Sequence, residues 1–487
     1  MITAASSAWY ADPEFDGTSL PVSDFSTRWM RRIFATSMST TTLRVFPAGS
    51  KQYRDTLTAG SELRDPDTGD YLLRLAEDAT PASVREQFRA FSHGRANALS
   101  PSLRIEATKI AAPLVAAMVG GLLLGAYRAN GLRSDAELHP LLTEDAAIEV
   151  GKAGGKTEAL VWREMVLAET QRRIMALVDA PANYKRPQDL AAWAAESGDA
   201  YGYDVRVLDE QECAVEGLGA LLAVNRGSED PARFIVMEYK GKGAPEKKGP
   251  VALIGKGITF DTGGVSIKGS ANLHLMKSDM GGAAAVFGTL EAAARLELPV
   301  HLVGVVPSTD NSVDALSIKP SDVIVGHSGK SIEIIDTDAE GRLVMSDGLS
   351  YANQNFSPSV LIDVATLTGS AVRTFGYECG AIISKNKKLV RAFRKAGDGC
   401  GERVWPLPPW DSYDALFQTD VADIKNYSGR PINGAIDAFK FLEFFTDDHL
   451  AFVHFDIAGV ALKQGAYAKD RQATGFGMRL FIEWLGG

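Results

Sequence analysis

The chain has 487 residues, of which 45% are hydrophobic and 23% charged, a balance typical of a folded globular protein. This length exceeds what one hydrophobic core usually supports, so we expect two domains. The net charge of −10 gives no general attraction to nucleic acid or to anionic membranes. No CxxC pair occurs among the three cysteines, which argues against a thiolate zinc site and favours a reducing compartment.

The first 155 residues mix strand-like and helical patterns and contain no cluster of catalytic side chains. The pattern predicts a strand at Thr42–Phe46 and a helix at Ala82–Phe91. Three acidic residues near the start argue against a secretory signal and against a transit peptide: Asp12, Glu14 and Asp16. We therefore predict a small N-terminal α/β domain over residues 1–155 and a cytoplasmic protein.

An uncharged stretch of 18 residues, Ile110–Tyr127, reaches the length at which a membrane span has to be considered. Pro113 lies near its start, and three glycines lie inside it. Helices that are apolar all round are also normal inside a large soluble domain. We predict a buried core helix and no membrane partner.

A segment rich in glycine and lysine, Gly151–Lys156 (GKAGGK), indicates a domain boundary. Beyond it, apolar residues recur at helical spacing from Thr157 to Val178, and Pro181 follows. We predict a connecting helix over residues 156–180.

From residue 181 to residue 487, short apolar runs alternate with helical stretches, which is typical of a mostly parallel sheet flanked by helices. Helices are expected, for example, at Gly282–Leu296 and Arg342–Ala352. The fold class is α/β, with this larger C-terminal part as the catalytic domain, and ligands are expected just past the carboxyl ends of its strands. The expected strands are Val251–Ile254, His301–Val306, Ser331–Ile335, Val360–Val364 and Phe452–Phe455.

Acidic and basic residues gather after two of these strands. Lys256–Lys268 (KGITFDTGGVSIK) follows the first strand, and Lys277-Ser278-Asp279 comes next. Asp336–Arg342 (DTDAEGR) follows the strand that ends at Ile335. Burying several carboxylates without cations would be costly, and hard oxygen ligands without a cysteine or histidine cluster suit magnesium, manganese or zinc. The sequence thus favours a metal site.

The same residues also have a purely structural interpretation. Asp336, Asp338 and Glu340 could cap the helix that follows them, and Lys268 and Arg342 could form ordinary salt bridges. Capping does not explain why a second strand end carries the same chemistry, so the metal interpretation is favoured.

Two histidines near these motifs are interpreted as structural rather than as ligands. His327 is expected in a loop and His454 inside an apolar strand.

These motifs resemble those of the leucine aminopeptidase (cytosol aminopeptidase) family. Asp336–Leu343 (DTDAEGRL) is similar to the family's signature octapeptide, which usually begins with Asn, and Lys256–Lys268 is similar to its upstream motif. The resemblance covers residues 181–487, whereas the first 150 residues match loosely through LLLGAY. Further matches follow in the family's order at Met276–Gly282 (MKSDMGG), Asp363–Gly369 (DVATLTG), Ser428–Pro431 (SGRP) and His454–Gly459 (HFDIAG).

The resemblance implies a role for each matching residue. Lys268 would stabilise the tetrahedral oxyanion, and Arg342 would hold a bicarbonate ion that acts as the general base. The substrate pocket would be lined by Met276, Leu367, Gly369 and Ala458. Two divalent metal ions, bridged by Asp261 and Glu340, would be bound by Lys256, Asp261, Asp279, Asp338 and Glu340.

The implied function is that of a leucyl aminopeptidase, a metallo-exopeptidase of peptide catabolism. Such an enzyme removes leucine-like, apolar N-terminal residues from peptides with a water activated by two metal ions (Zn, Mn or Mg). The resemblance also implies a homohexamer.

Two other functions fit the sequence less well. A two-metal phosphoesterase is disfavoured because no histidine-rich ligand set is present. A catalytically idle scaffold or DNA-binding regulator is disfavoured by the acidic charge and by the intact ligand set. The absence of GxSxG and HExxH argues against serine and single-zinc mechanisms.

Overall fold

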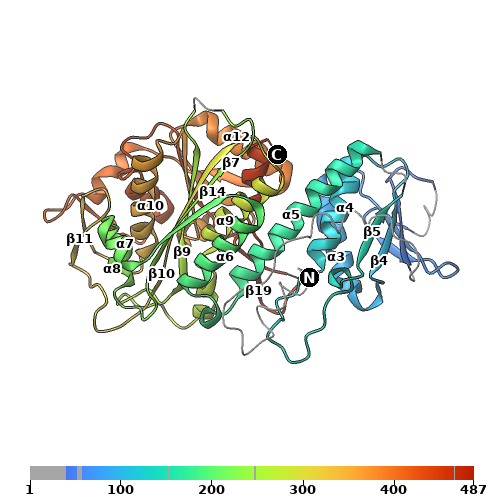
Figure 1. Ribbon diagram of the computed structural model, residues 1–487, viewed down its shortest axis with the longest axis horizontal. Coiled ribbons are helices and arrows are strands. Elements are labelled where there is room, and N and C mark those ends of the chain that lie inside the picture. Colours follow the sequence, from blue (N-terminus) through green and yellow to red (C-terminus); the bar gives the residue numbers. More distant parts are fainter. Residues whose placement is uncertain (1–39, 52–56, 152–153, 246–247, 466, 487) are drawn as a thin grey trace. The chain divides into compact units, whose positions relative to one another are not determined.

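The computed structural model describes residues 40–51, 57–151, 154–245, 248–465 and 467–486, coloured along the chain in Figure 1. The acidic residues Asp12, Glu14 and Asp16 lie outside these ranges. The chain divides into two compact units. The N-terminal unit comprises the residues up to Arg173 together with Gln464–Asp470, and the C-terminal unit comprises Ile174–Lys463 and the residues from Arg471 onward.

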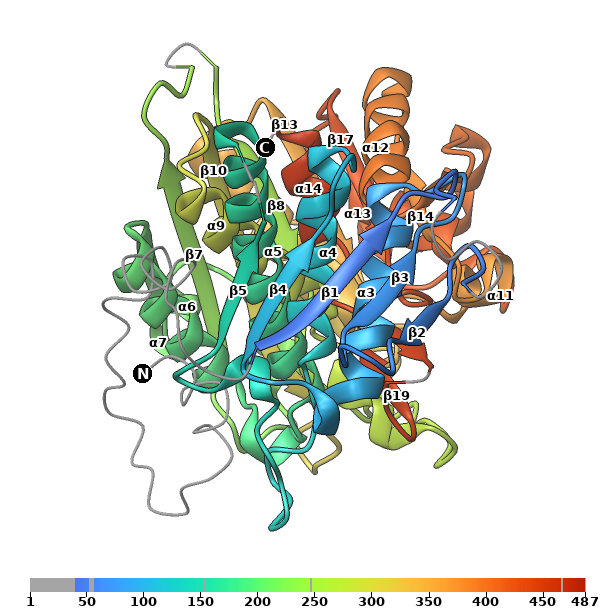
Figure 2. The same cartoon turned by 90° about the vertical axis from the view of Figure 1, so that its right-hand side faces the viewer.

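The N-terminal unit is built on a five-stranded sheet with the order β2-β3-β1-β4-β5, which faces the viewer in Figure 2. β1 pairs in parallel with β3 and β4, and β4 pairs in parallel with β5. β2 forms the opposite edge, antiparallel to β3. The bounds are β1 Thr40–Phe46, β2 Glu62–Arg64, β3 Tyr71–Arg74, β4 Ser102–Glu106 and β5 Ala147–Val150.

Helices α3 (Pro81–Arg95) and α4 (Ala112–Gly125) of this unit pack closely on each other. The close approach of these two helices requires glycine at position 121, since a Cβ there would lie 2.3 Å from the carbonyl oxygen of Arg85 on α3. α4 is buried from Val115 onward, so the uncharged stretch forms the core helix predicted for it. Within the described ranges, no helix is both long enough and apolar enough to cross a bilayer.

Helix α5 (Gly155–Asp179) contains the border between the two units, at Arg173 and Ile174. The segment Gln464–Asp470 belongs to the N-terminal unit although its neighbours in sequence do not. Its Tyr467 hydroxyl donates a hydrogen bond of 2.6 Å to Glu86 Oε1. The described part of this unit also contains two short 3-10 helices, η1 (Ala96–Ala98) and η2 (Pro140–Leu142).

The C-terminal unit is organised around a nine-stranded sheet with the order β15-β14-β17-β13-β8-β10-β7-β6, in which β9 also pairs with β10. The neighbours β17, β13, β8 and β10 run parallel, and antiparallel pairs lie toward both edges. The bounds are β6 Asp204–Leu208, β7 Arg233–Lys240, β8 Val251–Gly255, β9 Gly257–Asp261, β10 His301–Asn311, β13 Val360–Ala365, β14 Gly380–Ile383, β15 Val404–Pro406 and β17 Phe452–Asp456.

Helices cover this sheet in two groups, which Figure 1 shows on opposite sides of the strands. α9 (Gly281–Arg295) packs with α6 (Pro187–Tyr201) and α14 (Met478–Trp484), and α14 packs with α12 (Lys387–Cys400). α10 (Glu340–Phe356) packs with α8 (Gly219–Asn225) and α13 (Gly434–Glu443). The other helices are α7 Glu210–Val215, α11 Gly369–Phe375, η3 Ala182–Tyr184, η4 Leu273–Ser278 and η5 Asp411–Phe417. This is the α/β architecture predicted from the sequence.

One predicted strand lies in a different sheet from the one expected. β12 (Ser331–Glu333) pairs with β11 (Val323–Val325) and β16 (Ile424–Lys425) in a separate three-stranded sheet. Only Ile332 is buried in β12, whereas a central strand covered by helices on both faces is apolar throughout. Placing Ser331–Ile335 in the main parallel sheet was therefore wrong. A two-stranded sheet, β18 (Leu462–Gln464) with β19 (Arg471–Ala473), completes the fold.

Candidate active site

The carboxyl end of β8 places Lys256 at the base of a cavity of about 680 Å³ in the C-terminal unit. The Lys256 amide donates to the carbonyl of Val364 on β13 (3.1 Å), and its carbonyl accepts from Ala283 on α9 (2.9 Å). The backbone is thus fixed between the sheet and a helix. A Cβ at position 341 would lie 2.6 Å from Lys256 Nζ, so the glycine of the octapeptide makes room for the amine.

All residues to which the resemblance assigned a role line this one cavity. Those predicted to bind metal or act on the substrate are Lys256, Asp261, Lys268, Asp279, Asp338, Glu340 and Arg342. Those predicted to line the substrate pocket are Met276, Leu367, Gly369 and Ala458.

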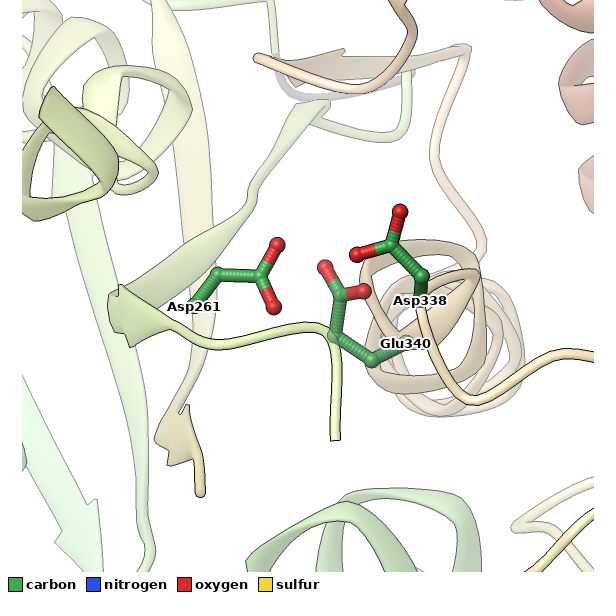
Figure 3. Close-up of side chains that lie close together, drawn as sticks. All are labelled: Asp261, Asp338 and Glu340. Carbon is green, nitrogen blue, oxygen red and sulfur yellow. The ribbon is translucent and has the colours of Figure 1, made fainter. Parts of the chain in front are cut away.

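Three carboxylates point toward one another at the centre of the site, as Figure 3 shows. Asp261 ends β9, Asp338 lies in the loop after β12, and Glu340 begins α10. Each offers an oxygen within 4.8 Å of the other two. This spacing is small enough for the three side chains to share a cation.

Two lysines supply the positive charge nearest to these acids. Lys256 Nζ lies 2.7 Å from Asp279 Oδ2 and 2.8 Å from Glu340 Oε1. Lys268 Nζ lies 2.8 Å from Asp261 Oδ2 and also pairs with Asp338. When all four carboxylates are ionised, the two ammonium groups leave a net charge of −2.

Burial dominates the titration of the group. It raises the pKa of Asp338 to about 7 and that of Asp279 to about 8, and it raises the pKa of Glu340 as well. Burial alone would lower the pKa of both lysines, but the surrounding carboxylates outweigh it and hold the pKa of Lys256 and Lys268 above the ordinary value. The protein's own cations therefore do not fully compensate these acids.

Divalent cations fit this set of donors. Glu340 Oε2 is buried and accepts no hydrogen bond within the described part of the chain. A buried carboxylate oxygen without a donor is costly, and carboxylate oxygens are the ligands that hard divalent ions prefer. A bound cation would neutralise the net negative charge of the ionised group, and it would lower the raised pKa values of the carboxylates.

The loop that carries Asp338 is held to the loop after β9 by reciprocal hydrogen bonds. The Thr337 hydroxyl donates to the Gly263 carbonyl (2.8 Å) and accepts from the Ser266 amide (2.7 Å). Asn311, at the end of β10, donates to Asp261 Oδ1 (2.9 Å) and to the Thr337 carbonyl (3.2 Å). The two acidic strand ends are thus fixed relative to each other.

Asn426, the residue directly after β16, holds the same loop in place. Its amide nitrogen donates to the Asp336 carbonyl (2.6 Å), and its amide oxygen accepts from the Ile335 amide (2.8 Å). Arg342 Nη1 donates to the Asn426 carbonyl (3.0 Å). Burial lowers the pKa of Arg342, but an arginine keeps its charge in proteins. Its buried Nε has no acceptor among the described residues, which suits a bound anion.

Sequence reasoning assigned no role to several residues that build this site. Asn311 and Asn426 are single polar residues outside any motif. Thr366 lies inside DVATLTG, and its hydroxyl donates to Asp279 Oδ1 (2.7 Å) while its carbonyl accepts from Lys256 Nζ (3.3 Å). The motif itself was the signal that could have identified Thr366.

Asp336, which stands where the family usually has Asn, lines the cavity and accepts a hydrogen bond from the Asp338 amide (2.9 Å). An asparagine oxygen could accept the same bond. The loop geometry therefore does not require the carboxylate, and what this residue adds is a further acidic group near Asp338.

The two histidines set aside as structural do not line the cavity. His454 on β17 lies opposite Asp363 on β13, and the fully buried side chains pair at 2.5 Å. His327 Nδ1 lies 2.9 Å from the Ser350 hydroxyl.

Comparisons with known proteins identify the family of the chain. The catalytic domain of the cytosol aminopeptidase family matches residues 173–482. A probable cytosol aminopeptidase of Chlorobaculum tepidum is 43% identical over 382 residues, which are 77% of this chain and 75% of the relative. The corresponding protein of Syntrophotalea carbinolica is 43% identical over 375 residues, 76% and 74% of the two chains.

Among solved structures, the bottromycin maturation enzyme BotP in complex with Mn superposes with a TM-score of 0.81 at 30% identity, over 91% of this chain and 98% of that chain. The family's catalytic domain matches more than half of the chain, and relatives in the family are more than 40% identical to it. The chain therefore belongs to the cytosol aminopeptidase family of metal-dependent exopeptidases.

Proposed function

We propose that this protein is a two-metal aminopeptidase that removes leucine-like, apolar residues from the N-termini of peptides. The observation that carries the proposal is the group of Asp261, Asp338 and Glu340, with its unsatisfied buried oxygen, beside two lysines in one cavity. The bound manganese of BotP supports a divalent ion in this fold.

The ligands we propose for two divalent ions (Zn, Mn or Mg) include one unusual member, Lys256, which must coordinate as a neutral amine. Neighbouring divalent cations disfavour its protonation by repulsion. Asp261 and Glu340 would help to hold both ions, since Glu340 contacts Lys256 on one side and lies near Asp261 and Asp338 on the other. Held by these residues, two divalent ions would supply an activated water and polarisation of the scissile carbonyl. The full proposed set is Lys256, Asp261, Asp279, Asp338 and Glu340.

Of the two lysines, Lys268 is the one that a bound substrate can reach. Its side chain is 24% exposed, compared with 3% for Lys256. We assign to it the stabilisation of the negative charge that develops on the carbonyl oxygen as the peptide bond is attacked. Arg342 cannot accept a proton, so we assign to it the binding of an anion, bicarbonate, that takes up the proton of the attacking water.

The N-terminal side chain of the substrate would lie against the apolar part of the cavity. Met276, Leu367 and Ala458 line it, and Gly369 adds no side chain. Such a surface suits leucine or methionine. Apolar pockets separate similar side chains by only ~1–3 kcal/mol, so we expect a graded preference rather than strict specificity.

Assembly and location are proposed from family membership. We propose a cytoplasmic homohexamer that acts in peptide catabolism, with active sites enclosed so that folded proteins are not degraded. Analytical ultracentrifugation at micromolar concentration checks this, and a monomer alone would contradict it.

The experiment that tests the proposed function is a panel of aminoacyl fluorogenic substrates, each with a free and an N-acetylated α-amine, assayed with several divalent metals. We expect cleavage of free-amine substrates only, with apolar residues preferred, because the α-amine is part of what the site binds. Hydrolysis of acetylated substrates at comparable rates would contradict the proposal.

A further inference from the structure

The active-site cavity carries a second set of charges, which the proposed chemistry does not use. Three arginines, Arg373, Arg430 and Arg471, line the cavity together with the carboxylates and lysines described above. Arg373 and Arg430 are exposed to solvent, whereas Lys256 and Glu340 are buried. The wall therefore changes from buried, mostly acidic groups to exposed, basic ones.

Arg373 belongs to α11, the short helix that follows the apolar wall, labelled in Figure 2. Its Nη1 lies 3.2 Å from the position that a Cβ of Gly369 would take, so the guanidinium folds back over the start of its own helix. Gly369 and Arg373 both line the cavity. The charge is therefore presented to the space that the substrate would occupy.

The path from the reacting groups to Arg373 is short. A Cβ at Gly341 would lie 2.6 Å from Lys256 Nζ and 2.8 Å from Leu367 Cδ1, which places the Leu367 side chain beside the lysine. Gly369 is two residues further along, and two residues of chain span at most about 7 Å. One or two residues of an extended peptide cover a similar length.

Arg471 and Arg430 approach the cavity from other parts of the chain. Arg471 on β19 donates to the Tyr377 hydroxyl (2.7 Å) and lies 4.8 Å over the same ring, just beyond α11. Arg430 follows β16, and its amide donates to the Ser428 hydroxyl (3.3 Å). Within the described ranges, neither Arg373 nor Arg430 forms an ion pair with a carboxylate. Two guanidinium groups thus remain available for an anion.

We propose that Arg373 and Arg430 bind a carboxylate on the substrate, one or two residues after the cleaved bond. The proposal rests on the proposed aminopeptidase function. The acids and lysines of the proposed metal site take the α-amine and the scissile carbonyl, so the rest of the peptide extends past Gly369 toward the two arginines. Guanidinium groups bind carboxylates through paired hydrogen bonds. The favoured substrates are short peptides that carry a C-terminal carboxylate, or an acidic side chain, at this position.

The test compares matched substrates that differ in one carboxylate. Leu-Gly is compared with Leu-Gly-amide for the terminal carboxylate, and Leu-Asp-amide with Leu-Asn-amide for a side-chain carboxylate. We expect kcat/KM to be about 5-fold higher for the acid of at least one pair, with the ratio falling as salt is added, because exposed ion pairs contribute modestly and are screened. The pair in which the acid is cleaved with the higher kcat/KM identifies whether the bound carboxylate is the C-terminal one or that of a side chain.

Variants then assign the effect to these residues. Arg373→Gln and Arg430→Gln should each bring the acid-to-amide ratio toward 1 by raising KM for the acid, and Arg373→Glu should lower it further. Arg391→Gln changes an exposed arginine of α12 that does not line the cavity, and it should leave the ratio unchanged. Ratios near 1 in the unmodified protein, or a ratio insensitive to both arginines, would overturn this inference alone. If none of the four peptides is cleaved, the proposed function fails and the inference fails with it.

Discussion

Two clusters of acidic side chains in the C-terminal unit have similar geometry and opposite electrostatics. Within the described ranges, Asp261, Asp338 and Glu340 form one cluster, and Asp411, Asp414 and Glu443 form the other. Lysines pair with both. In the first cluster burial raises the pKa of the buried Glu340, whereas in the second the exposed Asp411 has its pKa lowered by Lys385 and Lys440.

This difference in burial and pairing indicates that a high density of acidic side chains does not by itself require a bound metal ion. The carboxylates of the second cluster are largely hydrated, and Lys385 and Lys440 bridge them from two sides. In the first cluster the acids are mostly withdrawn from water and one oxygen of Glu340 lacks a donor. Burial without full compensation, rather than the number of acids, therefore separates the proposed catalytic cluster from the surface cluster.

The largest expected effect comes from removing metal. Exhaustive chelation should reduce peptidase activity to background and lower the melting temperature, because an ion that binds only the folded state stabilises it. Adding back Mn, Zn, Co or Mg should restore both. Elemental analysis measures the bound ions, and full activity in protein confirmed to be metal-free would contradict the two-metal proposal.

Replacing the substrate-facing lysine should impair the rate without removing metal. Lys268→Ala should lower kcat by something like 10²–10³, the usual scale for one group that stabilises an oxyanion, while the metal content stays unchanged. Lys385→Ala is the matched control, since Lys385 also bridges two acids, but in the surface cluster. An equal loss of activity in both variants would remove the distinction between the clusters.

A ligand variant should fail in the opposite way. Asp338→Ala should lose metal affinity on the order of 10-fold or more, since changes even to groups behind the ligands cost that much. Excess metal should then partly restore its rate, whereas Asp414→Ala should keep both its metal content and its rate. If Lys268→Ala lost metal while Asp338→Ala kept it, the two roles would have to be exchanged.

The smallest expected effect is a pH dependence of the metal-free protein. Asp338 and Asp279 have pKa values of about 7 and about 8 when folded, so near neutral pH the native state holds protons that the unfolded chain has released above about pH 4. The free energy of unfolding should therefore fall as pH rises from about 4 to about 8. Melting temperatures of chelated protein measure the slope, and Asp338→Asn should flatten it. An unchanged slope in that variant would show that the titration arises elsewhere.

The site residues could be predicted because their information is local. Lys256 and Asp261 lie in one motif that follows a strand of the main sheet, and Asp338 and Glu340 lie in a second motif. Because the second motif follows β12 of the separate sheet, the resemblance of both motifs to one family, rather than shared strand ends, predicted that they meet. The four strands of the parallel core were predictable for the same reason, since buried central strands are continuous apolar runs.

Residues joined by single long-range contacts could not be predicted. Asn426 lies about 90 positions from Asp336 and belongs to no motif, yet its amide holds that loop through two hydrogen bonds. β12 is too short, and its burial too uneven, for its sequence to reveal which sheet it joins. The pairing of Arg471 with Tyr377 likewise depends on tertiary structure alone.

The separate three-stranded sheet gives the two halves of the site different mechanical support. Lys256 and Asp261 adjoin strands of the main sheet, whereas the Asp338 loop depends on strands of two or three residues and on Asn426. Small elements with few buried contacts open at a free energy well below that of global unfolding. Ions would then enter and leave when the small sheet opens, while the main sheet keeps its structure. The residence time of the metal would depend on how long β12 stays paired in the small sheet, rather than on the stability of the whole domain.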